Sequence, residues 1–210
     1  MSILQEISTY LQQGRVPMVK ELVQKALEEG IDPKTILEEG MLQGMDVIGG
    51  KFKRNEVFVP QVLIAARAMN AGVEVLKPHL VASGVEPAGT AIIGTVKGDL
   101  HDIGKNLVKM MIEGKGLKVI DLGVDVPPEK FVEGIIENDA SIVCCSALLT
   151  TTMNEMKNVV DIIAEKGLRD KVKIMVGGAP ITQAFCESIG ADCYTEDAAS
   201  AAEAAYSFCL

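Results

Sequence analysis

The sequence has no tryptophan, and aromatic residues make up only 4% of its 210 residues. Its 20 Lys and Arg residues are outnumbered by 29 Asp and Glu residues, which gives a formal net charge of −9. A nucleic-acid-binding protein needs a basic surplus to neutralise phosphates, so this charge argues against one. No run approaches the roughly 20 apolar residues of a membrane span. These absences, with 48% hydrophobic residues, predict an ordinary soluble α-rich or α/β protein.

Paired cysteines are also missing. The five cysteines are odd in number and contain no C-x-x-C pattern, which argues against structural disulfides. Cys144 and Cys145 lie in the apolar run SIVCCSALL and are expected in the core. The first residues lack a basic region, an apolar stretch and a cleavage site, so we expect no secretory signal. The expected compartment is the cytoplasm.

Residues 1–82 have helical punctuation and almost no strand signal. Four amphipathic segments with short loops predict a small antiparallel bundle. The fourth segment, VPQVLIAARAMNAGVEVLKP, is expected to begin around Pro60 and to end before Pro78. Residues 83–89 are expected to form a linker with a hinge near Ser83 and Gly84.

Residues 90–210 alternate strand and helix signals five times. Such βα units predict an α/β domain with a flavodoxin-like (Rossmann-like) five-stranded parallel sheet, order 2-1-3-4-5. In that topology a ligand crevice lies beyond the carboxyl ends of strands one and three. The first strand is followed there by GTVKGDLHDIGKNLV, the most distinctive stretch of the chain.

This stretch places Asp99 two residues before His101. Side chains two apart in an extended loop share a side, so Asp99 can accept the proton of one imidazole nitrogen and raise the basicity of the other. Carboxylates hold metal-ligating histidines in this way. Too few further ligands lie nearby for structural zinc, so a metal that already carries its other ligands, as in a tetrapyrrole-like cofactor, fits better.

Four other features fall at the same edge of the predicted sheet. Each has an ordinary explanation: Gly104 as a loop glycine, Gly177 and Gly178 as a tight turn, and Ser146 as a helix cap or core hydroxyl. Glycines at a binding edge also let a ligand approach the backbone closely. Their convergence favours a binding site.

Asp99-x-His101-x-x-Gly104, Ser146-x-Leu148 and Gly177-Gly178 together resemble the B12-binding motif of cobalamin-dependent methyltransferases and mutases. The upstream segments LQGMDVIGGKF and VFVPQVLIAARAM resemble the helical cap module of the methyltransferases, as in methionine synthase. The resemblance covers nearly the whole chain and implies a corrinoid protein of an anaerobic methyl-transfer system.

Such a protein accepts a methyl group on the reduced cobalt of cobalamin or a related corrinoid, and passes it to a second protein. The resemblance therefore implies a donor-specific methyltransferase, an acceptor methyltransferase and a reductive activase as partners, with no nucleic acid and no membrane. The methyl donor would be a methoxylated aromatic, a methylamine or methanol. The chain would be a component of a methyltransferase system and not an autonomous enzyme.

The resemblance also implies residue roles. His101 would be the axial ligand to cobalt, and Asp99 would hold it. Thr152 would continue this chain of contacts where methionine synthase has a serine. At Gln43 the methionine synthase pattern has a glutamate, so a polar contact from there is not expected.

The path of the displaced base and nucleotide tail would be lined by Ser146, Leu148, Thr150, Gly177, Gly178 and Ala198. Gly98, Leu100, Asp102, Ile103 and Gly104 would contact the corrin edge. Phe58, Met45 and Val62 would shield its upper face, although packing between helices is the ordinary explanation for Met45, as it is for Met41 and Met69.

Three other protein classes remain open. A cobalamin-binding sensory module is expected to adjoin a DNA-binding or signalling domain, for which these residues leave no room. The small subunit of a B12-dependent mutase shares the Asp-x-His-x-x-Gly motif but does not need the helical cap. A flavodoxin-like or receiver protein without corrinoid would lack a corrinoid spectrum.

Overall fold

The computed structural model describes all residues, 1–210. Its backbone contacts divide the chain into two compact units. One contains Met1–Pro87 with Gly114–Gly116, and the other contains Ala88–Glu113 with Leu117–Leu210. The predicted limits of the cap, linker and α/β domain stay predictions.

The first unit is entirely helical. Two of its helices begin at a side chain that accepts a free amide of the first turn: Ser2 accepts from Gln5, and Asp32 accepts from Thr35. Its elements are α1 (Ile3–Gln12), α2 (Val16–Glu28), α3 (Pro33–Thr35), the π-helix η1 (Ile36–Leu42), α4 (Gln43–Lys53) and α5 (Val59–Ala82). Apolar side chains at helical spacing fill its interior, which confirms a helical N-terminal region.

Helix α5 is longer than the sequence predicts. The prediction that it ends before Pro78 is wrong, because α5 continues to Ala82 with that proline inside. Proline removes one amide donor, but the residues that follow still find acceptors one turn back. The Ser83 amide donates to the carbonyl of His79 at 3.0 Å. The loss is therefore confined to one hydrogen bond near the end of the helix.

The second unit is a five-stranded parallel sheet in the order β2-β1-β3-β4-β5, as predicted. The strands are β1 (Thr90–Val96), β2 (Lys118–Val126), β3 (Ile142–Ser146), β4 (Lys173–Gly177) and β5 (Cys193–Tyr194). The helices are α6 (Ile103–Glu113), α7 (Pro128–Asn138), α8 (Glu155–Glu165), α9 (Gln183–Ser188) and α10 (Ala198–Ser207), with a short 3-10 turn η2 (Arg169–Lys171).

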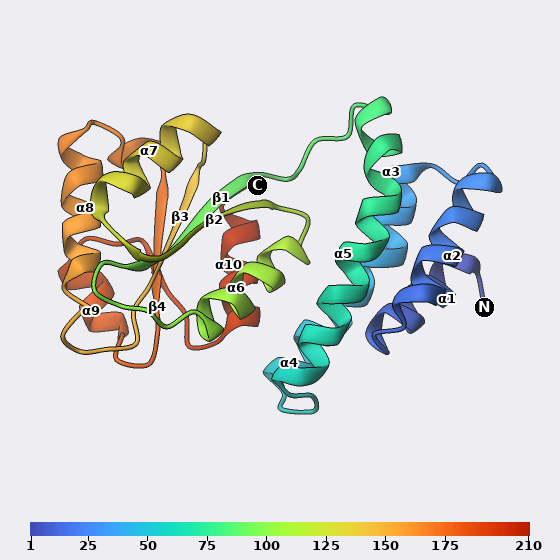
Figure 1. The fold of residues 1–210 in the computed structure, drawn as a ribbon, viewed down its shortest axis with the longest axis horizontal. Coiled ribbons are helices and arrows are strands. Elements are labelled where there is room, and N and C mark those ends of the chain that lie inside the picture. The colour runs from blue at the N-terminus through green and yellow to red at the C-terminus, as the bar shows by residue number, and fades with distance from the viewer. The chain divides into compact units, whose positions relative to one another are not determined.

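Helices cover both faces of the sheet (Figure 1). Helices α6 and α10 lie on one face, and α7, α8 and α9 lie on the other. The larger core lies between the sheet and the second set, with Phe131, Met156 and Ile92 fully buried. Because every strand runs in the same direction, all five carboxyl ends meet at one edge. That edge holds the residues described next.

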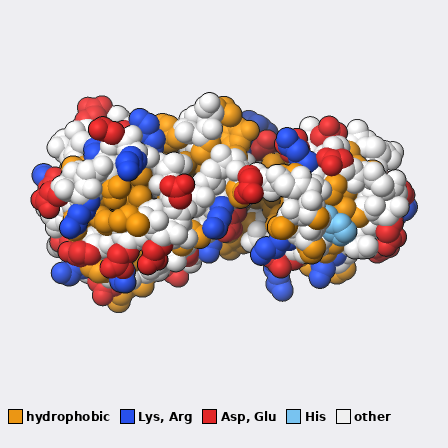
Figure 2. Space-filling model, turned by 90° about the horizontal axis from the view of Figure 1, so that it is seen from above, with side chains coloured by type: hydrophobic (Ala, Val, Ile, Leu, Met, Phe, Trp, Pro, Cys, Tyr) orange, Lys and Arg blue, Asp and Glu red, His pale blue; other side chains and the backbone are white.

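The surface carries charges of both signs. Figure 2 shows acidic and basic side chains interspersed on one face of the molecule, with areas of apolar side chains between them. The net negative charge is therefore not gathered in one place on that face. None of the helices combines the length and the hydropathy needed to cross a membrane.

Candidate functional site

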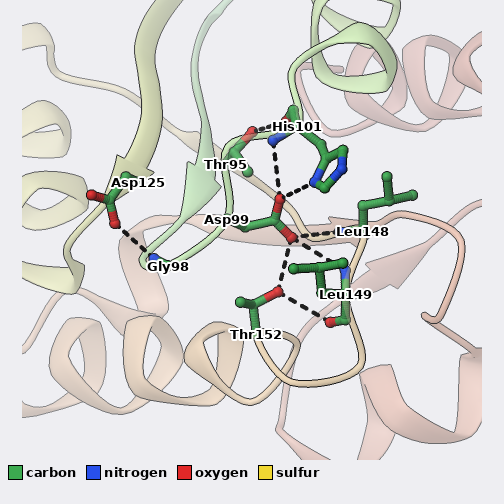
Figure 3. Close-up of polar contacts among 8 residues, drawn as sticks. All are labelled: Thr95, Gly98, Asp99, His101, Asp125, Leu148, Leu149 and Thr152. Atoms are coloured by element: carbon green, nitrogen blue, oxygen red, sulfur yellow. Dashed lines mark hydrogen bonds and ion pairs between the residues drawn. The ribbon is translucent and has the colours of Figure 1, made fainter.

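The loop that joins β1 to α6, residues 97–102, is held at defined points (Figure 3). Gly98 adopts a φ of +81°, a conformation that glycine adopts without steric cost. The hydroxyl of Thr95, a fully buried residue of β1, donates to the carbonyl of His101 at 2.8 Å. This loop therefore presents Asp99 and His101 from a fixed backbone.

The Asp99 carboxylate is fully buried and accepts five hydrogen bonds. Its Oδ1 accepts from the amide of His101 at 3.1 Å and lies 2.8 Å from the ring Nδ1 of the same residue. Its Oδ2 accepts from the amides of Leu148 at 2.8 Å and Leu149 at 3.3 Å, and from the hydroxyl of Thr152 at 2.8 Å. One carboxylate thus ties the β1–α6 loop to the segment after β3.

These contacts decide the charge of Asp99. Burial is the largest single effect, and it acts to raise the pKa of Asp99. The hydrogen bonds from the Leu148 and His101 amides, the His101 ring and the Thr152 hydroxyl together outweigh it and hold that pKa well below its usual range. Asp99 is therefore ionised at neutral pH.

An ionised Asp99 also fixes the imidazole tautomer of His101. A carboxylate only accepts hydrogen bonds, so the proton must reside on Nδ1. In the neutral ring Nε2 then carries a lone pair, and this atom has no hydrogen-bond partner in the structure. The side chain is 51% exposed. His101 thus offers one oriented nitrogen ligand outward from the edge of the sheet.

The surface around His101 is apolar and open. Leu100 and Ile103 are 71% and 77% exposed, and Leu148 and Leu149 about 40%. A side-chain carbon added at Gly104 or Gly177 would meet no atom within 4 Å. Exposed large apolar side chains grouped at one edge mark a binding surface, so a large, partly apolar ligand can lie against this edge.

Gly178 differs from its neighbour Gly177. Its φ is +131°, and a Cβ there would lie 1.8 Å from the backbone oxygen of Ala147. Glycine is needed here because β4 and the end of β3 approach closely, whether or not a ligand is bound. The amide of Ala147 donates to the carbonyl of Gly177 at 3.2 Å.

The other predicted residues of this unit follow the strand ends. Ser146 ends β3, where it pairs with Thr95 of β1 and Gly177 of β4. Thr150 is exposed in the turn that follows, while Ala198 is buried in the first turn of α10. Asp102 accepts from the Asn106 side chain at 3.1 Å, across the first turn of α6.

The predicted shielding residues belong to the helical unit. Met45 and Val62 are buried inside that unit, as are Met41 and Met69. Phe58 precedes α5 and is 62% exposed, so it is the one of the three shielding candidates that presents an apolar surface. Gln43 is exposed at the start of α4.

Sequence reasoning missed two residues that hold the β1–α6 loop, Thr95 and Asp125. Asp125, near the end of β2, accepts from the amide of Gly98 at 2.7 Å, and its own amide donates to the carbonyl of Asp99 at 2.9 Å. No local pattern marks Asp125, which lies two residues before Pro127, because its contact with the loop depends on the irregular end of β2.

The fold and the residues at this edge are those of a B12-binding protein. Two family models of the B12 binding domain match the chain, one over residues 89–205 and a second over residues 3–77. The chain belongs to this B12-binding family. Its corrinoid cofactor and the fold predicted for it are thereby confirmed, whereas the roles of the individual site residues stay predictions.

Proteins similar in sequence or structure indicate which kind of B12-binding protein this chain is. The chain is 44% identical over 201 residues to a dimethylamine corrinoid protein of Methanosarcina barkeri, which covers 95% of this chain and 93% of that protein. It is 45% identical over 183 residues to trimethylamine corrinoid protein 1 of Methanosarcina acetivorans, covering 86% and 85%. A methanol:cobalamin methyltransferase complex of Methanosarcina barkeri contains a chain that matches with a TM-score of 0.89 and 32% identity, covering 99% of this chain and 79% of that one. The protein is a member of the corrinoid proteins of methyl-transfer systems.

The residues present fit a corrinoid. The edge offers one nitrogen ligand whose partner nitrogen is held by a buried carboxylate, apolar side chains that can lie against a macrocycle, and open space at Gly104 and Gly177. These are the features that a cobalt ion already ligated by its own macrocycle requires of a protein.

Proposed function

We propose that this protein carries a methyl group for a methylamine methyltransferase system, with His101 as the axial ligand that the protein supplies to cobalt. Two relatives with more than 40% identity over most of the chain are dimethylamine and trimethylamine corrinoid proteins, and they support a methylamine as the donor.

The observation that carries the proposal is the pairing of His101 with the buried carboxylate of Asp99. The contact occupies Nδ1 and leaves Nε2 as an unprotonated ligand with a fixed direction. When bound, a corrinoid supplies a cobalt centre that accepts a methyl group in its reduced form and releases it to a nucleophile. The chain's own residues determine how strongly the axial nitrogen binds.

Asp99 and Thr152 tune that nitrogen. The ionised carboxylate accepts from Nδ1 and so fixes the orientation of the ring and the nitrogen that would face the cobalt. The hydroxyl of Thr152 donates to the other oxygen of the same carboxylate, so it weakens the negative electrostatic potential of that carboxylate at His101. Asp99 itself remains ionised under its many hydrogen bonds, so its carboxylate presents a constant negative charge to His101 at neutral pH.

The remaining predicted residues would hold the ligand. The corrin edge would be contacted by the residues around the His101 backbone, namely Gly98, Leu100, Asp102, Ile103 and Gly104. The path of the displaced base and nucleotide tail would be lined by residues at the ends of β3 and β4 and after β5, namely Ser146, Leu148, Thr150, Gly177, Gly178 and Ala198. In the helical unit, exposed Phe58 would shield the upper face; Met45 and Val62, proposed for the same role, are buried inside that unit.

The partners proposed are a methylamine-specific methyltransferase, an acceptor methyltransferase and a reductive activase. The similarity to a chain of a methanol:cobalamin methyltransferase complex supports a methyltransferase as a partner of this chain too.

The test is a donor screen with the corrinoid-loaded, reduced protein. It is mixed with methyltransferases specific for monomethylamine, dimethylamine, trimethylamine, methanol or a methoxylated aromatic, each with its substrate, and methylation is followed by the visible spectrum. We expect methylation with a methylamine. Methylation with methanol alone would contradict the donor, and no methylation with any donor by a fully loaded protein would contradict the carrier function.

A further inference from the structure

The end of β2 is irregular beside the β1–α6 loop. Along β1, Ile93 pairs with Asp121, Gly94 with Gly123, and Val96 with Val126, so β2 contains an extra residue at each of two register shifts. Bulges of this kind redirect the side chains of a strand and are common beside functional sites. Here they bring Asp125 to the β1–α6 loop.

Asp125 occupies a costly backbone conformation. Its φ is +52°, in the left-handed region that side chains other than glycine rarely adopt. Its carboxylate Oδ1 accepts from the amide of Gly98 at 2.7 Å, and its amide donates to the carbonyl of Asp99 at 2.9 Å. These two bonds hold the Lys97–Gly98 and Asp99–Leu100 peptides, which flank Gly98 and Asp99. Figure 3 shows the bond between the Asp125 carboxylate and the Gly98 amide.

The contacts of Asp125 lie directly before the site. The backbone that Asp125 holds is that of Gly98 and Asp99, and the Asp99 side chain in turn fixes the His101 ring. Thr95 holds the backbone of the same loop at the carbonyl of His101. Strand β2 therefore holds the start of the loop and β1 holds its end.

We propose that Asp125 is a positioning residue: through the Gly98 amide it sets the loop so that the Asp99 carboxylate meets Nδ1 of His101. This inference rests on the proposed function for its consequence, axial ligation by His101. The hydrogen bond itself can be tested in the protein without corrinoid.

Three substitutions separate the side chain from the backbone strain. Asp125→Asn keeps an acceptor oxygen and tolerates a left-handed backbone. Asp125→Gly relieves the strain but removes the acceptor, and Asp125→Ala removes the acceptor and keeps the strain. Asp139 provides the matched control, because it also has a positive φ, of +49°, but follows α7 at the opposite end of the sheet. Asp139→Ala therefore keeps comparable strain without touching the loop.

The first measurement is amide hydrogen exchange in the corrinoid-free full chain, with global stability measured by urea unfolding. We expect the Gly98 amide to exchange roughly tenfold faster or more in Asp125→Gly and Asp125→Ala, as loss of a hydrogen bond to a charged group implies. Asp125→Asn and Asp139→Ala are expected to leave it near the wild-type rate.

The second measurement is the fraction of bound corrinoid with a histidine axial ligand, compared at equal cofactor occupancy by the visible spectrum. We expect a lower fraction in Asp125→Gly and Asp125→Ala, and recovery in Asp125→Asn. A general loss of stability would not produce this order, because glycine relieves strain that alanine keeps.

The proposal is overturned if Asp125→Gly retains the wild-type Gly98 exchange and histidine-bound fraction, or if Asp125→Asn is impaired as strongly as Asp125→Gly. It is also overturned if Asp139→Ala reproduces the effects of Asp125→Ala. Absence of histidine ligation in the wild-type protein would contradict the proposed function instead, and the exchange measurement would still decide whether Asp125 holds the loop.

Discussion

The carboxylate of Asp99 and the imidazole of His101 are joined by a 2.8 Å contact between Oδ1 and Nδ1, with the carboxylate fully buried and the ring half-exposed. This difference in burial gives the two residues different roles. The buried partner stays ionised because five donors surround it, and the exposed partner keeps its second nitrogen available for a ligand.

Asp99→Asn tests the charge of this pair. An amide is a weaker acceptor for Nδ1 and can present its own donors instead, so the tautomer of His101 is no longer fixed. We expect the variant to retain corrinoid, while the affinity of the His101 nitrogen for cobalt falls by roughly 10- to 100-fold. The spectrum of the loaded protein measures this loss. Wild-type axial ligation in Asp99→Asn would show that the charge of Asp99 is not used.

The same residue predicts a pH dependence of stability. Because the pKa of Asp99 is lowered by folding, its contribution is fully present above the usual carboxylate pKa and is lost as the pH falls toward the lowered value. Asn has no such titration. We expect the difference in unfolding free energy between wild type and Asp99→Asn, measured by urea without corrinoid, to shrink between about pH 7 and about pH 3. A constant difference would contradict the assignment.

Thr152 can be tested by separating its hydroxyl from its methyl group. Thr152→Val keeps the shape but removes the donor to Asp99, and we expect it to lower the free energy of unfolding by about 1–3 kcal/mol. Thr152→Ser keeps the donor and should retain axial ligation. If both variants ligate equally, the hydroxyl does not act on His101.

Gly177 and Gly178 are expected to respond differently to a side chain. Gly177 faces open space, so Gly177→Leu should fold normally and bind corrinoid weakly if the nucleotide tail passes there. Lys173→Leu adds the same side chain at the opposite end of β4 and is the control. Gly178→Ala should be destabilised by more than about 2 kcal/mol, because its Cβ would overlap the oxygen of Ala147. Wild-type corrinoid affinity in Gly177→Leu would exclude this path.

The architecture of the α/β unit could be predicted because each of its signals is local. Strand and helix patterns alternate along the chain, and the handedness of parallel connections leaves few arrangements of five such units. The carboxyl edge, and with it the convergence of Gly104, Ser146 and Gly177, follows from that topology alone. The contact between Asp99 and His101 was predictable for the same reason, since two residues of one loop make it.

Contacts made by distant segments were harder to predict. Strand β2 passes through two register shifts before it ends at Val126. Bulges depend on the neighbouring strand and have no reliable local pattern, so Asp125 was not recognised. The bond between Thr152 and Asp99 spans 53 positions and was expected only from the family resemblance. Helix α5 continues past Pro78 because the residues after it still find carbonyl acceptors one turn back, which a proline in the sequence does not reveal.

The central claim, that His101 supplies the axial nitrogen to cobalt, is tested most directly by electron paramagnetic resonance of the corrinoid-loaded protein in its cobalt(II) form, prepared with ¹⁵N-labelled histidine. A ¹⁵N ligand splits each cobalt line into two, whereas the ¹⁴N of the cofactor's own base splits it into three. We predict doublets that persist in His79→Ala, the other histidine of the chain, and disappear in His101→Ala. Triplets in the labelled wild-type protein, or doublets that survive in His101→Ala, would contradict the account.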